Sequence, residues 1–126
     1  MMKNYLFLFL VLLVSLIGCQ SNNLNLPQNV SSIEVYEWDE NTLFTTIEDS
    51  ELIDDLVEEL NRAKTASTAD MDYPLPEYEL IFKNGENEEV FRVGFYNEVV
   101  NLGVKGRYLD VNEDIMYQVD LKLPFY

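Results

Sequence analysis

The sequence contains no histidine, and Cys19 is the single cysteine among its 126 residues. Without an imidazole there is no general base for a serine or cysteine nucleophile, so triads of the Ser-His-Asp and Cys-His types are excluded. Zinc sites built from cysteine and histidine are excluded for the same reason. A single cysteine also excludes an intramolecular disulfide. Acid–base chemistry by carboxylates is the main catalytic option that remains.

Basic residues are scarce as well, because eight lysines and arginines stand against 23 aspartates and glutamates. Lys3 is the only basic residue before Cys19, so seven basic against 23 acidic side chains give the rest of the chain a charge of −16. Such a surface repels phosphate backbones and anionic lipid head groups. We therefore expect no nucleic-acid partner. The charge keeps a domain soluble, and it also favours a basic protein partner.

The chain has one long apolar segment, residues 5–17, which follows a short start carrying Lys3. Its thirteen residues have the length of the apolar region of an export signal. A membrane-spanning helix needs about 20 apolar residues. The segment leads directly into polar residues 20–23 without a basic flank. We therefore expect residues 1–18 to be a signal peptide.

The stretch Leu16-Ile17-Gly18-Cys19 resembles the lipobox of bacterial lipoproteins. This resemblance implies transfer of a diacylglyceryl group to the Cys19 sulfur and cleavage before Cys19. The acyl chains of such an anchor hold a protein at the membrane because each buried methylene contributes about 0.8 kcal/mol. Residues 19–30 are then expected to be a polar tether. An uncleaved anchor and ordinary secretion are the alternatives.

Alternating apolar and polar residues predict two hairpin strands at 32–38 and 42–47. Asp49 or Ser50 then caps a helix that ends near Lys64. The apolar residues of this helix recur on one face, and its charged residues occupy the opposite face. It is the clearest element in the sequence.

The remainder predicts a meander of strands followed by a short helix. Strands are expected at 77–83 and 89–96, joined by a two-residue Asn84-Gly85 turn, and again at 99–103 and 106–111. Residues 65–71 form a loop, and a helix capped by Asn112 runs from Glu113 to about Leu123. The order ββα-ββββ-α predicts an α+β domain over residues 31–126, with an antiparallel sheet of five or six strands and one main helix.

Several of these features resemble the small YhfM-like domain of Gram-positive lipoproteins. They are the helix start at 47–53, the Pro76-x-Tyr78-x-Leu80-x-Phe82 pattern and Asn84-Gly85. The resemblance covers residues 31–123 and departs at 122–126, which is unusually short. It implies a fold and a location on the outer face of the cytoplasmic membrane, and it carries no activity and no functional residues onto this chain.

Glu77 and Glu79 are the candidate carboxylate pair. On one face of a strand they lie about 6.6 Å apart, a spacing compatible with glycosidase chemistry. A domain of this size has little room for a sugar cleft, so we expect a solvated strand face and no enzymatic activity.

Asp110, Asn112 and Asp114 have the spacing that opens an EF-hand calcium loop. Ile115 and Leu121 occupy the positions where that loop needs glycine and glutamate. Capping of the expected terminal helix accounts for the same residues. They are weak metal candidates, and we expect no cofactor.

Two surfaces are candidates for partner binding. The expected helix presents Glu51, Asp55, Glu58 and Glu59, which suit a basic protein. Tyr73 lies among prolines in a loop, and such loops often form protein contacts. We expect a membrane-anchored, non-enzymatic interaction or accessory module. A cation- or small-ligand-sensing domain is the alternative, and a calcium-dependent shift in melting temperature distinguishes it.

Overall fold

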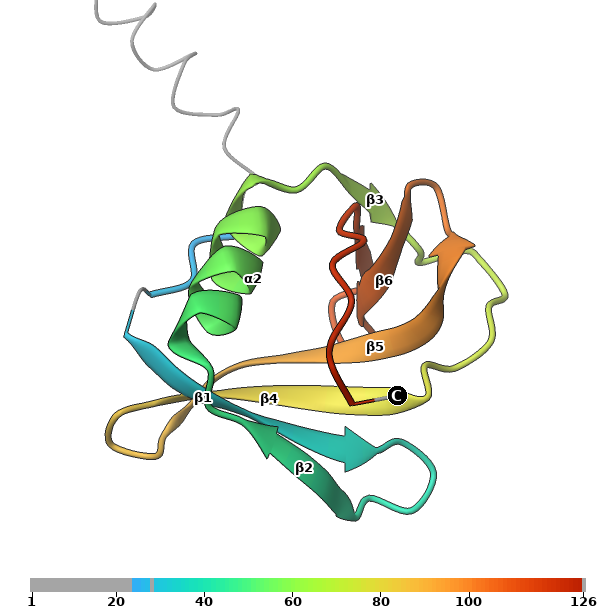
Figure 1. Cartoon of the computed structure of the whole chain (residues 1–126). Coiled ribbons are helices and arrows are strands. Elements are labelled where there is room, and N and C mark those ends of the chain that lie inside the picture. The colour runs from blue at the N-terminus through green and yellow to red at the C-terminus, as the bar shows by residue number, and fades with distance from the viewer. Residues whose placement is uncertain (1–23, 28, 126) are drawn as a thin grey trace, which may run out of the picture.

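The computed structural model describes residues 24–27 and 29–125. In this part of the chain, one helix packs against a seven-stranded antiparallel sheet (Figure 1). The predicted α+β class is therefore confirmed. The sheet has seven strands rather than five or six. The expected signal peptide and Cys19 lie outside the described residues.

The elements follow one another along the chain as β1 (Val30–Glu37), β2 (Leu43–Ile47), α2 (Ser50–Arg62), β3 (Thr65–Ser67), β4 (Tyr78–Asn84), β5 (Glu89–Asn101), β6 (Lys105–Asp110) and β7 (Ile115–Tyr117). Their order in the sheet is β2-β1-β4-β5-β6-β7-β3, and all neighbours are antiparallel. The long strand β5 bends from the half that contains β1 and β4 to the half that contains β6 (Figure 1). As a result, β2 and β3 are the two edge strands.

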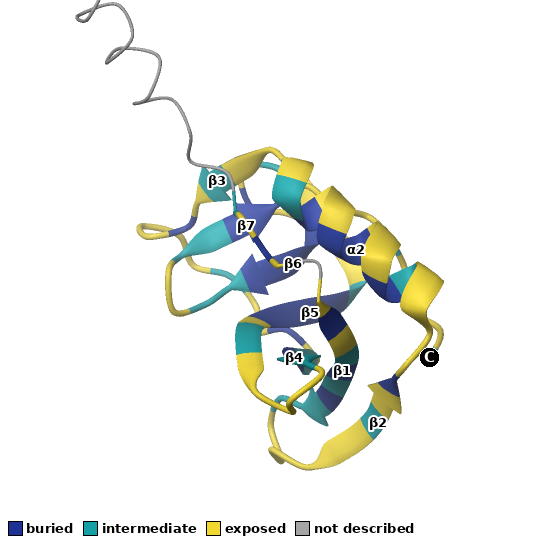
Figure 2. Ribbon diagram, turned by 90° about the vertical axis from the view of Figure 1, so that its left-hand side faces the viewer, coloured by how far each residue is buried: buried dark blue, intermediate teal, exposed yellow. Residues whose placement is uncertain are grey.

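The helix α2 begins at the predicted cap. Asp49 has an extended backbone, and its side chain accepts hydrogen bonds from the backbone N–H groups of Glu51 and Leu52 at 3.1 and 3.5 Å. Four apolar residues bury one side of the helix against the sheet, while the opposite side is exposed (Figure 2). The buried residues are Ile53, Leu56, Val57 and Leu60.

The sheet is covered on both faces at the β6–β7 end. Tyr108 and Tyr117 belong to the main core, which also contains the buried side of α2. Leu109 and Met116, the alternate residues of the same strands, belong to a second core with Tyr96 and Leu102. Successive residues of a strand point to opposite faces, so each strand contributes to both cores.

The described end of the expected tether is part of the fold. Leu26 is buried in the main core. Its N–H donates to Asn61 Oδ1 at 2.8 Å, and Asn61 Nδ2 donates to the Leu26 carbonyl at 3.3 Å. Among the described residues of the expected tether, Leu26 is therefore attached to α2.

The predicted terminal helix over residues 113–123 is wrong. Asp114 has a φ of 56°, in the left-handed region, and so interrupts a right-handed helix at its first turn. The following residues pair with β6 as the strand β7. The apolar residues of this segment divide between the cores, with Met116 in the second core and Val119 and Leu123 in the main core.

Three smaller predictions also differ from the structure. The expected loop at 65–71 contains β3, which pairs with β7. The strands expected at 89–96 and 99–103 are joined, because β5 continues without a turn to Asn101. The β4–β5 turn is longer than two residues: Asn84 Oδ1 accepts hydrogen bonds from the N–H groups of Glu86 and Glu88 at 3.0 Å, and Asn87 has a φ of 63°.

Candidate functional site

The acidic excess is mostly not neutralised within the fold. All 23 aspartates and glutamates are among the described residues, and ion pairs within 4.0 Å engage five of them. This leaves 18 acidic side chains without a basic partner in the described part of the chain. Four of the seven basic residues after Cys19 are used in those pairs, namely Arg62, Lys83, Arg92 and Arg107.

The four acidic helix candidates share the exposed side of α2. Glu51, Asp55, Glu58 and Glu59 are all exposed, and Figure 2 shows this side of the helix facing away from the sheet. Arg62 Nη2 and Glu58 Oε1 form an ion pair at 2.8 Å, with both side chains largely in solvent. The shared face is thus in place, and its role in binding remains a prediction.

The loop that contains Tyr73 is held against the second core. Tyr73 is half-buried and packs on that core. The Tyr96 hydroxyl donates to the Pro74 carbonyl at 2.6 Å. The large exposed apolar side chains of this loop are Met71 and Leu75, at 42% and 57%. Tyr73 is therefore mainly a packing residue, and the loop's free apolar surface lies on its neighbours.

The carboxylates of Glu77 and Glu79 have separate structural partners. Glu77 precedes β4, and its Oε2 accepts a hydrogen bond from the Asn97 N–H at 3.2 Å. Glu79 lies in β4, and its Oε1 binds Arg92 Nη1 at 2.9 Å. These contacts link β4 to β5 and give both carboxylates a role in the fold.

The calcium candidates occupy the turn between β6 and β7. Asp110 Oδ1 accepts a hydrogen bond from the Glu113 N–H at 3.0 Å. The backbone of Asp114 lies in the left-handed region, with a φ of 56°. Asn112 is an exposed turn residue and caps no helix. Within the described ranges, no group of three histidine, cysteine, aspartate or glutamate side chains is placed to hold a metal ion.

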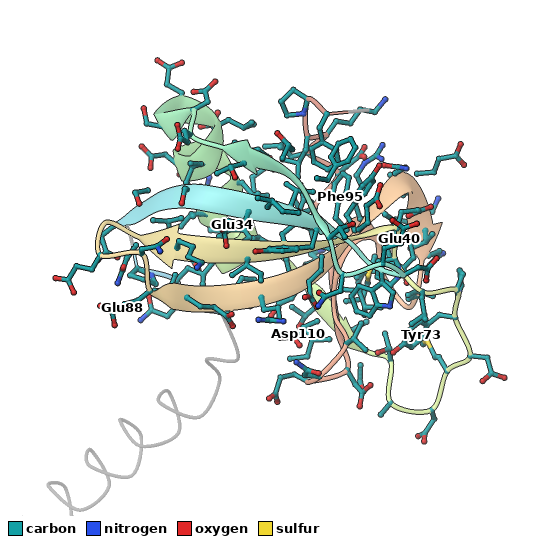
Figure 3. All side chains as sticks on the ribbon, turned by 90° about the horizontal axis from the view of Figure 1, so that it is seen from below. Glu34, Glu40, Tyr73, Glu88, Phe95 and Asp110 are labelled. Atoms are coloured by element: carbon teal, nitrogen blue, oxygen red, sulfur yellow. The ribbon has the colours of Figure 1, made fainter. Side chains whose placement is uncertain are left out.

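One hollow, of about 420 Å³, lies beside α2. A smaller hollow, of about 230 Å³, lies at the β1–β2 turn. The smaller hollow combines aromatic and acidic side chains, with Trp38 and Tyr78 beside Glu37, Glu40 and Glu77. Figure 3 shows Glu40 and Tyr73 toward the same end of the molecule and Glu88 toward the other. The sequence did not reveal this hollow because it joins residues about forty positions apart.

No known protein family, curated protein or solved structure matches this chain. No helix in the described part of the chain has both the length and the apolar character needed to cross a membrane. The resemblances to the lipobox and to the YhfM-like domain therefore stay predictions.

Proposed function

We propose that this protein is a non-enzymatic interaction module, anchored by a lipid on Cys19 to the outer face of a Gram-positive cytoplasmic membrane, and that its acidic surface binds a basic protein. The observation that carries the proposal is the set of 18 acidic side chains without a basic partner in the described part of the chain. Uncompensated like charges raise the free energy of the compact state. A partner of opposite charge lowers this free energy, and the acidic surface attracts it over several ångströms.

The helix α2 offers the most concentrated part of this charge. Glu51, Asp55 and Glu58 are spaced by one turn along its exposed side, and Glu59 lies beside them. Side chains spaced by three or four residues are neighbours on a helix surface. This arrangement suits a partner surface that carries several lysines or arginines.

A covalent lipid anchor is consistent with this charge. The acidic domain is repelled by anionic lipid head groups, so it does not settle on the bilayer by electrostatic attraction. An anchor at Cys19 would hold it near the membrane while the charge keeps its surface free for proteins. The domain itself begins to pack by Leu26, only a few residues beyond that anchor.

Chemical cross-linking on intact cells, followed by mass spectrometry, tests the proposal. We expect one dominant basic partner that is lost when Cys19→Ala releases the protein from the membrane. A variant with Glu51→Gln, Asp55→Asn, Glu58→Gln and Glu59→Gln is expected to lose the partner. A control that neutralises Glu86, Glu88, Glu98 and Glu113 removes the same charge elsewhere and is expected to retain it.

Ionic strength gives a second test with purified proteins. Salt screens exposed charges over about 8 Å at physiological concentration, so we expect binding to weaken steeply as sodium chloride is added. Binding that is indifferent to salt, or the absence of any specific partner on cells, contradicts the proposal.

The hollow at Trp38 favours the alternative function, a cation- or small-ligand-sensing domain. An indole face attracts organic cations, and neighbouring carboxylates strengthen that attraction. If this alternative holds, choline chloride raises the melting temperature more than sodium chloride at equal ionic strength, and Trp38→Ala abolishes the difference.

A further inference from the structure

The edge strand β2 has a free side. Its ladder partner is β1, and β2 stands at the end of the seven-stranded order. In residues 24–27 and 29–125, no other backbone hydrogen bond reaches Leu43–Ile47. Figures 1 and 2 both show β2 at the border of the molecule with no element beyond it. An edge of this kind presents unpaired backbone donors and acceptors.

The side chains of β2 are unusual for a protected edge. Its sequence, Leu-Phe-Thr-Thr-Ile, contains no charge and no proline, although charged residues and prolines are common means of blocking edge pairing. Leu43 and Phe44 are 54% and 46% exposed. The opposite edge, β3, has only three residues. Of the two edges, β2 is the one that offers both backbone groups and apolar side chains.

A bulge limits the length of this edge. The register to β1 shifts so that Phe44 is the extra residue between Leu43 and Thr45. Bulges bend and twist a strand, so only a short segment can pair with β2. Phe44 also contacts the rings of Tyr78 and Phe125, with centroids 5.5 and 5.8 Å away, and this fixes one side of the edge.

The charges at both ends of β2 determine which kind of strand can pair with its free edge. Asp39 and Glu40 precede the strand, Glu48 and Asp49 follow it, and all four are exposed. A second copy paired with β2 in either direction brings acidic residues opposite acidic residues, which is destabilising. A strand with basic residues at both ends instead meets opposite charge at both ends.

We propose that the edge of β2 binds an extended segment of a basic partner protein, which adds to the sheet as an eighth strand. The segment has apolar or β-branched residues at its centre and lysines or arginines on both sides. Backbone hydrogen bonds supply the attachment, and the side chains supply the selection. This inference rests on the proposed function and identifies where the partner docks, next to the start of the acidic face of α2.

A synthetic peptide tests the inference on the full chain, purified in a neutral detergent. The probe has alternating valine and threonine between two lysines at each end. We expect its addition to shift the amide resonances of Thr45, Thr46 and Ile47 in ¹⁵N-labelled protein. A peptide of the same sequence, N-methylated at alternate backbone nitrogens, has the same charge but cannot form a ladder, so we expect its affinity to fall at least tenfold.

A matched pair of variants locates the surface. Leu43→Lys places a charge on the edge, and we expect it to weaken peptide binding about tenfold. Leu75→Lys makes the same change at a leucine of similar exposure, 57% against 54%, in the loop before β4. We expect Leu75→Lys to bind like the unchanged protein. Unchanged melting temperatures in both variants confirm that the fold is intact.

Several outcomes overturn the inference without overturning the proposed function. Equal, salt-dependent affinity for both peptides means that charge alone is recognised and no strand is added. Loss of binding in Leu75→Lys instead of Leu43→Lys places the docking surface on the loop. A peptide-free dimer that Leu43→Lys dissociates assigns the edge to a second copy. A basic partner that cross-links on cells equally well to Leu43→Lys retains the function and rejects this edge.

Discussion

Arg107 is buried, and the carboxylate that it contacts, Asp120, is mostly in solvent. Their side chains are 6% and 74% exposed, and Arg107 Nε lies 2.9 Å from Asp120 Oδ1. The same guanidinium donates to the backbone carbonyls of Tyr96, Asn97 and Asp120. Arg107 therefore ties the bend of β5 to the segment after β7, chiefly through backbone oxygens.

This difference in burial predicts that substitutions of Arg107 and Asp120 lower the free energy of unfolding by different amounts. Arg107→Lys keeps the charge but removes the planar set of donors, so we expect the free energy of unfolding to fall by about 1–3 kcal/mol as backbone carbonyls lose their donor. Asp120→Asn removes the charge of the solvent-exposed partner and is expected to lower the free energy of unfolding by less than about 1 kcal/mol. Urea denaturation of both variants measures the difference. A larger loss in Asp120→Asn than in Arg107→Lys would show that the ion pair, rather than the carbonyl contacts, is the source of the stabilisation.

Two buried tyrosines predict a loss of stability at alkaline pH. Burial raises the pKa of Tyr117 from 10.0 to about 12, and Asp110 and Glu113 add to the shift. Burial likewise raises the pKa of Tyr96 to about 12, with Tyr73 and Glu77 contributing. Because the folded pKa is the higher one, this stabilisation is complete below pH 10 and declines as the pH rises from 10 to 12.

The ultraviolet absorbance of tyrosinate, followed together with circular dichroism, measures that decline. We expect part of the tyrosinate signal to appear only as the fold is lost. In Tyr117→Phe one ionising group is absent, so the alkaline transition should move to higher pH if packing is retained. A tyrosinate titration that is complete near pH 10 with the fold intact contradicts the prediction.

Gly106 is predicted to tolerate no side chain, whereas Gly85 tolerates one. A Cβ at Gly106 would overlap the carbonyl oxygen of Tyr117 and lie 3.0 Å from the Val119 nitrogen. Both are backbone atoms that cannot move independently of the strand. Gly106→Ala is therefore expected to lower the free energy of unfolding by about 1–3 kcal/mol. At Gly85 a Cβ meets nothing within 4 Å, so Gly85→Ala should change stability by less than about 1 kcal/mol. Similar stabilities of the two variants, measured by thermal denaturation, contradict this prediction.

The elements that the sequence predicted well are those with a single dominant local pattern. β1 and α2 each have one apolar face, so their periodicity determined both type and position. Asp49 indicated the start of the helix because its side chain accepts hydrogen bonds from N–H groups of the first turn. The acidic face of α2 followed directly from that spacing.

The failures lie where tertiary contacts decide the structure. β3 and β7 have three residues each, too few for a periodic pattern. They form through long-range pairing, because β7 pairs with β6 on one side and with β3 on the other. The spacing of Met116, Val119 and Leu123 matched a helix, but two cores on opposite faces of the sheet take up these residues. The free edge of β2 could not be predicted because strand order depends on which distant segments pair.

The final prediction concerns Asp49, which is both the cap of α2 and part of the acidic end of β2. Asp49→Ala removes the acceptor for the N–H groups of Glu51 and Leu52, so it should lower the free energy of unfolding by about 1 kcal/mol. Asp49→Asn keeps a capping oxygen and removes the charge, so it should change stability by less than about 0.5 kcal/mol. In the binding experiment, however, Asp49→Asn should weaken the lysine-flanked peptide, and this weakening should disappear at high salt. Urea denaturation and peptide titration of both variants separate the two roles. If Asp49→Asn binds the peptide as tightly as the unchanged protein does at low salt, Asp49 acts only as the helix cap and takes no part in selecting a basic partner.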